Sequence, residues 1–177
     1  MTQKEREMLE KILNTLDDDT PRLEYANWLK DHDTGDGKRA ARGEFIEVQC
    51  ALASPEIEGT QRTRLAGREH ELLNEHRREW EGHLVHVVKG ITLHRGFIHG
   101  VTIPLDDFIN YDKLLFNLAP TIREACITKC FYSDRVVVLA RSPHLERLTS
   151  LKLKGVDYAG VLRCSGFCGQ SNCLLLR

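Results

Sequence analysis

The acidic side chains near residue 17 are the first group in this chain that could do chemistry. Asp17, Asp18 and Asp19 stand in one run, and carboxylate oxygens are ligands that Mg²⁺ and Ca²⁺ prefer. A dedicated calcium loop, however, alternates its ligands and contains a glycine, which this run lacks. The alternative is a helix start, where carboxylates accept hydrogen bonds from free N–H groups and favour the positive end of the helix dipole. We favour the helix start, with Asp19, Thr20 and Pro21 setting the cap.

The cysteines offer a second kind of chemistry, a zinc site. The chain has six cysteines, of which Cys164, Cys168 and Cys173 fall close to its end. Paired zinc ligands commonly have two to four residues between them, so the spacing of Cys164 and Cys168 is admissible. His144 could supply a further ligand. The competing interpretation is that such cysteines are small apolar residues or unused thiols. We therefore predict no cofactor, and we keep a zinc-binding protein as the alternative.

No motif for a catalytic nucleophile is recognisable. The chain lacks the G-x-S-x-G turn, the Walker-type glycine loop and the Rossmann fingerprint, and no cysteine has the local sequence of a nucleophile. We predict that the protein is not an enzyme, and we keep a hydrolase with an unrecognised site as a second alternative. A deep pocket that holds a carboxylate and a histidine together would favour that alternative.

Length and charge narrow the class of protein. At 177 residues the chain makes one domain or two small ones, and its hydrophobic content of 41% is ordinary for a soluble globular protein. The formal net charge of −1 gives no general attraction to nucleic acid or to an anionic membrane. No apolar run approaches the roughly 20 residues of a membrane span, and the charged first residues do not form a signal peptide. We expect a cytoplasmic protein with reduced cysteines.

Apolar residues at helical spacing predict four helices in the N-terminal part. Their approximate ranges are 3–16, 20–31, 38–52 and 60–80. The last helix is rich in arginine, but glutamates are interleaved with the arginines, which is typical of a solvated mixed-charge face and not of a nucleic-acid site. We expect these helices to bury a common core of Leu13, Tyr25, Trp28, Phe45 and Trp80.

The pattern changes from about residue 85. β-Branched residues punctuated by Gly90, Gly96 and Gly100 predict short strands. Two further helices are expected, at about 106–117 and at about 134–141. A helical part therefore gives way to a mixed α/β part, and we place the boundary between residues 80 and 81.

Two segments of the second part repeat each other at a constant offset of 26 residues. The alignment places Ile122 with Leu148, Ala125 with Leu151, Ile127 with Leu153, and Cys130 with Val156. The spacing L-x-x-L-x-L-x-x-N/C is typical of leucine-rich repeats, whose period is about 20–29 residues. A looser unit with Val101 and Ile103 as its inward pair precedes them. An ordinary α/β domain with coincidental spacing is the alternative.

The N-terminal helices also carry a motif resemblance. The segment "DDDTPRLEYANWLKDH", followed by "RGEFIEVQ", resembles the repeat-companion domain, a short helical module at the N-termini of bacterial proteins, commonly ahead of leucine-rich-repeat-like sequence. The matching positions are Asp19, Thr20, Arg22, Leu23, Tyr25, Ala26, Trp28 and Leu29, and then Arg42, Glu44, Phe45, Ile46 and Gln49. Asn27 stands where aspartate is usual in the family, and Gly43 where alanine is common. Downstream, "RGFIHGV" and "SPHLERLTSLKL" also look like the region that follows this module.

The resemblance implies an architecture but no established activity. We predict an α+β protein, in which an N-terminal helical module over residues 1–80 is followed by a short, incomplete leucine-rich-repeat-like α/β solenoid over residues 81–177. The repeat spacing breaks off after Val156, so the C-terminal tail is expected to be irregular. Its apolar residues Leu174, Leu175 and Leu176 could support self-association, because the last unit of a solenoid leaves a hydrophobic face.

By analogy with leucine-rich repeats, we expect a non-catalytic binding protein or adaptor. The partner would be an unidentified protein, and neither nucleic acid nor a membrane is expected. Its binding surface would consist of solvent-facing strand positions, namely Arg123, Thr128, Lys152 and Lys154.

Overall fold

The structure, a computed structural model, describes residues 2–130 and 133–155. It is a mixed α+β fold whose residues group into two units. The helical unit comprises Met1–Trp80 and Leu93–Phe97, and the sheet unit comprises Glu81–Thr92 and Ile98–Arg177. Within the described ranges, no helix combines the length and the apolar character needed to cross a membrane.

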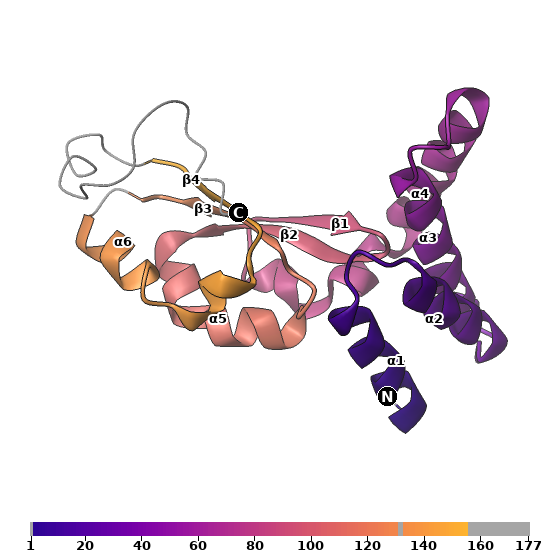
Figure 1. The fold of residues 1–177 in the computed structure, drawn as a ribbon, viewed down its shortest axis with the longest axis horizontal. Helices are drawn as coiled ribbons and strands as arrows, with labels where there is room; N and C mark the ends of the chain where they lie inside the picture. The colour runs from indigo at the N-terminus through magenta and orange to yellow at the C-terminus, as the bar shows by residue number, and fades with distance from the viewer. Residues whose placement is uncertain (1, 131–132, 156–177) are drawn as a thin grey trace. The chain divides into compact units, whose positions relative to one another are not determined.

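The four helices predicted for the N-terminal part are confirmed, with ends that differ from the prediction by no more than two residues. They are α1 (Gln3–Asn14), α2 (Thr20–Asp31), α3 (Lys38–Ala53) and α4 (Gly59–Glu81) (Figure 1). The first of them begins with a reciprocal capping box between Thr2 and Glu5. Each of these two residues satisfies a backbone N–H of the other, which fixes the start of the helix.

The start of α2 confirms the helix interpretation of the acidic run and corrects its cap. Asp18 accepts a hydrogen bond from the Thr20 N–H at 2.8 Å, so this carboxylate satisfies a donor that the first turn leaves free. Asp19 occupies the cap position, but its side chain makes no capping hydrogen bond. The predicted cap position at Asp19, with proline in the first turn, is therefore confirmed, but the capping hydrogen bond comes from Asp18. The Asp19 carboxylate instead faces two arginines, with Oδ1 3.4 Å from Arg95 Nε and 3.9 Å from Arg22 Nη1.

Three of the predicted core residues of the helical unit are buried. Tyr25, Trp28 and Phe45 are 7%, 6% and 0% exposed, which confirms them as core residues. Leu13 and Trp80 are half-buried. Trp80 still joins the core at its edge, because its ring centroid lies 4.4 Å from that of Phe45. Three of the five predicted core residues are thus buried, and the other two are only partly buried.

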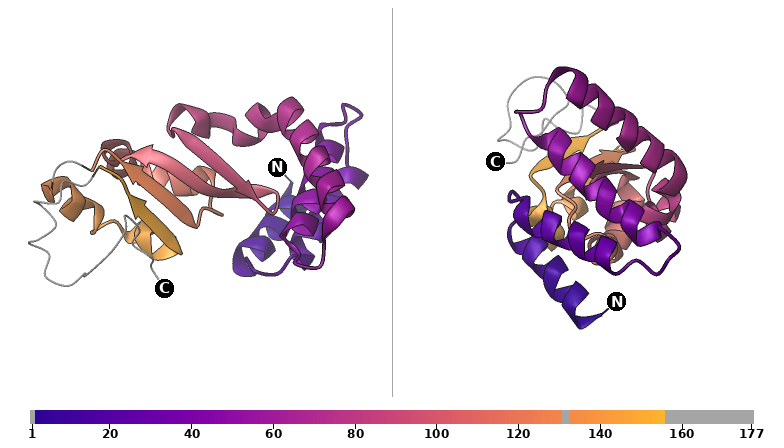
Figure 2. Two further views of the ribbon diagram at one scale, coloured as in Figure 1. Left: turned by 90° about the horizontal axis from the view of Figure 1, so that it is seen from above. Right: turned by 90° about the vertical axis from the view of Figure 1, so that its right-hand side faces the viewer.

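Helices α2 and α3 lie side by side at close range (Figure 2). A methyl group on Gly43 would come within 2.5 Å of the Ala26 carbonyl oxygen and within 2.9 Å of Lys30 Cγ. Alanine, which is common at this position in the family that the motif resembles, would therefore push the two helices apart. Glycine at position 43 permits a closer approach of the two backbones.

The sheet unit begins with a 3-10 helix where the sequence predicted a strand. This helix, η1 (Gly82–His86), is anchored by Leu84, which is 2% exposed and whose carbonyl accepts from the N–H groups of Val87 and Val88. The remaining elements are β1 (Gly90–His94), β2 (Phe97–Pro104), α5 (Leu105–Leu118), β3 (Glu124–Thr128), α6 (Ser133–Leu139), η2 (Pro143–Arg147) and β4 (Ser150–Leu153). The short strands predicted from about residue 85 are present as β1 and β2, but the first begins only at Gly90, because residues 82–86 form η1.

The strands form one sheet in the order β1-β2-β3-β4, in which β2, β3 and β4 are parallel. The inward pairs of the sequence alignment are neighbours in the observed register: Val101 with Ala125 and Leu151, and Ile103 with Ile127 and Leu153. Helices α5 and α6 lie on the same side of the sheet (Figures 1 and 2). The apolar pairs and the α5 residues Phe108, Leu115 and Phe116 form the core of this unit.

The turn between β1 and β2 packs within the helical unit. The Gly96 N–H donates a buried hydrogen bond of 2.7 Å to Gln49 Oε1, and Gln49 Nε2 donates to the Leu93 carbonyl oxygen at 3.4 Å. Gln49 is only 6% exposed, and its Nε2 also donates to Glu69 Oε1 at 2.7 Å. Its amide therefore has partners at both ends and satisfies the buried N–H of Gly96. Phe97 completes the contact, since it packs against the apolar cluster around Tyr25.

Replacing Gly96 by alanine is expected to lower the free energy of unfolding by about 2–5 kcal/mol. Gly96 has a φ of +83°, which costs an L residue about 1–2 kcal/mol. Its added methyl group would also lie 2.9 Å from the Cα of Ile46, and such overpacking costs about 1–3 kcal/mol. Urea denaturation measures the loss.

Gly37→Ala is the matched control for this experiment. Gly37 has a φ of +73°, and open space surrounds the position of its missing methyl group. It should lose only the backbone term of about 1–2 kcal/mol. Equal losses in the two variants would contradict the packing argument for Gly96.

Candidate binding surface

Polar side chains gather on the face of the sheet opposite the buried pairs. Thr102 of β2 pairs with Cys126 of β3, which pairs with Lys152 of β4. Because successive side chains alternate between the two faces of a strand, this row lies on the face away from Val101 and its partners. We call it the strand face, and it comprises Thr102, Glu124, Cys126, Thr128, Ser150 and Lys152.

The predicted partner-binding residues do not all join the strand face. Thr128 and Lys152 lie on it, and the exposed Lys154 follows directly after β4, where its N–H still donates to the Ile127 carbonyl at 2.8 Å. Arg123 precedes β3 and is half-buried, and its Nη1 donates to the Arg147 carbonyl oxygen at 2.8 Å. Three of the four predicted residues therefore lie near one another. Arg123 instead forms a hydrogen bond to the loop that contains Arg147.

The sequence did not lead us to two further residues of this surface. Glu124 is exposed on the strand face, and its Oε1 lies 3.6 Å from His99 Nε2. Lys129 is exposed just beyond β3, with a φ of +59°. Strand alternation could have found Glu124, because it stands two residues before Cys126. No local signal points to the left-handed backbone of Lys129.

The proposed zinc ligands fall partly outside the structure. Cys164, Cys168 and Cys173 lie outside the described residues. His144 is half-buried in η2, where its ring stacks on Phe116 at a centroid distance of 5.1 Å. Among residues 2–130 and 133–155, no three His, Cys, Asp or Glu side chains gather as a metal site would require. The zinc alternative therefore stays a prediction.

A buried polar cluster links the start of α2 to the β1–β2 turn. Arg95 Nη1 donates to the Asp17 carbonyl oxygen at 3.0 Å, and Arg22 Nη1 donates to the Asp18 carbonyl oxygen at 2.7 Å. Both guanidinium groups face Asp19. Burial, reinforced by the charge of this carboxylate, raises the pKa of the adjacent Cys50 thiol to about 12. The thiol therefore stays protonated at neutral pH and is a poor nucleophile.

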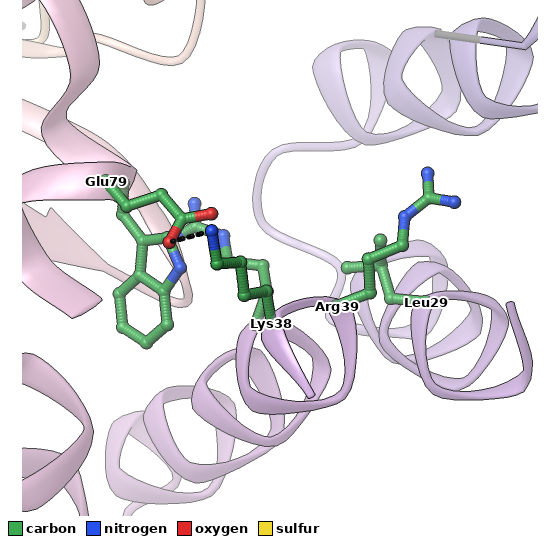
Figure 3. Close-up of a pocket in the computed structure, with 6 residues that line it drawn as sticks. Leu29, Lys38, Arg39 and Glu79 are labelled. Carbon is green, nitrogen blue, oxygen red and sulfur yellow. Dashed lines mark ion pairs between the residues drawn. The ribbon is translucent and has the colours of Figure 1, made fainter. Parts of the chain in front are cut away.

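The helical unit also contains a shallow pocket of about 270 Å³ that the sequence did not predict. Residues of α2, α3 and the end of α4 line it: Leu29, Lys38, Arg39, Arg42, Glu79 and Trp80. Figure 3 shows the Lys38 ammonium facing the Glu79 carboxylate, and their closest N–O distance is 3.9 Å. This lining contains a carboxylate but no histidine. The signal in the sequence was the basic run Lys38-Arg39 followed by Arg42, which reads as an ordinary helix face.

Arg42 is the most unusual side chain of this pocket. Its guanidinium carbon lies 5.0 Å from the ring centroid of Trp80, 5.7 Å from that of Phe45 and 5.8 Å from that of Phe97. Burial lowers the pKa of Arg42 to about 10, so the group is still a cation at neutral pH. Its Nη1 is buried without a hydrogen-bond partner among the described residues. Aromatic faces thus stabilise a charge that lacks an acceptor.

Comparison of this chain with protein-family models, with curated proteins and with solved structures finds no match.

Tyr25 is expected to ionise at a higher pH than a free tyrosine. Burial is the main reason that its pKa rises from 10.0 to about 12, and the negative charge of Glu5 and the 3.2 Å hydrogen bond to it add to the shift. Since the folded pKa is raised, the stabilisation is complete below about pH 10 and is lost as the pH rises through about 12. It amounts to at most about 3 kcal/mol.

Spectroscopic titration of tyrosinate in wild type and Tyr25→Phe tests this expectation. The difference between the two curves isolates Tyr25 and should show a step well above pH 10. A difference curve with its midpoint near 10 would show that the hydroxyl is not held by burial and Glu5.

Proposed function

We propose that this protein is a non-catalytic binding protein or adaptor that holds a protein partner on its strand face. The register of β2, β3 and β4 carries the proposal. Its apolar pairs point to one side, so that the row from Thr102 through Cys126 to Lys152 is available on the other. Stacked parallel strands of this kind form the extended binding surfaces of repeat proteins.

We also propose that the sheet unit is an incomplete leucine-rich-repeat-like solenoid. Val101 and Ala125 are 24 residues apart and paired, and Ala125 and Leu151 are 26 residues apart and paired. Both intervals fall within the period of about 20–29 residues that leucine-rich repeats use. The helical unit would then be the repeat-companion module that its motif resembles, with Gln49 serving its own packing.

The chemistry of the strand face favours an acidic partner. The side chains at its centre, Thr102, Cys126 and Ser150, are small and project little from the sheet. Lysines stand at one border, where Lys152 and Lys154 are exposed and the backbone pairs Lys154 with Cys130, next to the exposed Lys129. A partner segment could approach the small residues closely while its carboxylates contact the lysines. Such pairs contribute more to specificity and association rate than to raw affinity.

The cytoplasm remains the location that we propose. Cys50, Cys126 and Cys130 are free thiols, and reduced cysteines are the rule in that compartment.

Charge reversal at Lys152 and Lys154 is expected to abolish partner binding. The double variant Lys152→Glu and Lys154→Glu would place like charges opposite an acidic partner, which costs several kcal/mol across an interface. Affinity capture from the source cell, with quantitative identification of the proteins retained, measures the change. Both side chains are exposed, so the fold should be unaffected.

Lys113→Glu with Arg141→Glu is the matched control. It reverses the same number of charges at exposed positions at α5 and just after α6, away from the strand face. We expect this control to retain every protein that wild type captures. If the strand-face variant also retains them all, the proposed binding surface is wrong.

A further inference from the structure

Arg42 has no carboxylate within ion-pair distance in the described part of the chain, although it is a cation among aromatic rings. Its guanidinium lies over the faces of Phe45, Trp80 and Phe97. A guanidinium has five N–H donors, and a buried charge ordinarily has a paired, hydrogen-bonding partner. Glu79 lines the same pocket and its charge acts on Arg42, but Arg42 Nη1 has no hydrogen-bond acceptor among the described residues.

The other charges of the pocket leave room for an anion. Arg39 is already engaged, because its guanidinium contacts Glu5 at 3.4 Å and lies 5.0 Å from the ring centroid of Trp28. In Figure 3 its guanidinium points away from Lys38 and Glu79. The Lys38–Glu79 pair is long, at 3.9 Å, and both side chains are about half exposed. Such a pair contributes little stability and can open when a ligand enters.

We propose that this pocket binds a small organic carboxylate whose flat apolar body lies against Trp80 and Leu29. The ligand carboxylate would accept hydrogen bonds from Arg42 and from Lys38. The Lys38–Glu79 ion pair would break when the ligand binds. This inference is independent of the proposed function, because it concerns a different unit of the chain and no residue of the strand face.

The size and lining of the pocket select this class of ligand. A volume of about 270 Å³ is slightly less than the roughly 300–1,000 Å³ of sites for drug-sized molecules, so the ligand is small. Trp80 and Leu29 add apolar surface to the lining, which a bare inorganic anion would not use. A guanidinium matches the geometry of a carboxylate because it can donate two parallel hydrogen bonds.

Benzoate is the probe for this proposal, and benzamide is its neutral counterpart of the same shape. The chain has two tryptophans, so the indole N–H resonance of Trp80 in a nitrogen-15 spectrum is assigned by comparison with Trp28→Phe. Benzoate is expected to shift this resonance saturably, whereas benzamide and inorganic phosphate should not. Equal shifts with benzamide, saturation by phosphate alone, or no saturable shift with benzoate would overturn the proposal.

Three variants locate the site. Arg42→Met keeps an apolar chain over the rings and removes the donors, and it should weaken benzoate binding about tenfold or more. Lys38→Gln should weaken binding by a few fold, and Glu79→Gln should strengthen it by a few fold, because the first removes a positive charge and the second a competing negative one.

The last two variants keep the test decisive if Arg42→Met does not fold. Lys38 and Glu79 are half exposed, so their substitution leaves the core intact. Shifts of benzoate affinity in opposite directions support the site, and unchanged affinity in both variants places the binding elsewhere and overturns it. The strand-face variants should bind benzoate like wild type, which separates a failure here from a failure of the proposed function.

Discussion

The buried hydrogen bond from the Gly96 backbone to the Gln49 side chain is the contact on which the helical unit depends most. A turn that enters a helical core brings backbone donors and acceptors with it, and each one costs about 1–3 kcal/mol if it is left without a partner. Gln49 meets that cost with one amide, which accepts from Gly96 and donates toward Leu93. The left-handed backbone of Gly96 and the absence of a methyl group next to Ile46 then allow the turn to lie close to α3. The motif that resembles the repeat-companion domain contains both Ile46 and Gln49, so its pattern has a structural reason in this chain.

Cations held in apolar surroundings are the second feature of this unit. Arg22 is 5% exposed, and burial lowers its pKa, while the nearby Asp19 carboxylate offsets part of the effect. Arg42 has no carboxylate within ion-pair distance among the described residues; ring faces contact it, and the charge of Glu79 acts on it. Each arginine keeps a buried nitrogen without a hydrogen-bond partner in the described part of the chain, Nε in Arg22 and Nη1 in Arg42. Only Arg42 lines a pocket. That position, and not the number of basic residues, distinguishes a candidate ligand site from a packed cluster.

The sheet unit follows a different principle, in which a regular register produces a regular surface. One set of positions along β2, β3 and β4 is apolar and covered by helices, and the alternate set is polar. Because the strands are in register, Thr102, Cys126 and Lys152 form one row across them, and Glu124 lies beside Ser150. The proposed binding surface would therefore need no cleft. Side chains outside this alternation lie where the chain leaves the strands. Arg123, for example, donates a hydrogen bond to the Arg147 carbonyl oxygen.

The sequence by itself determined the helices of the N-terminal part and the register of the parallel strands. Apolar spacing encodes which face of a helix is buried, and the alignment of Ala125 with Leu151 anticipated their pairing because repeating units stack at their own period. Only the tertiary structure decided the partners of the polar side chains. Asp19 looked like a cap and faces Arg95, which comes from the distant β1–β2 turn. Arg42 was only a position of the motif, and it lies among rings from α3, α4 and β2. Periodicity records burial along one element, but it carries no information on which remote charge or ring will lie next to a given side chain, because the folding of the whole chain fixes that distance.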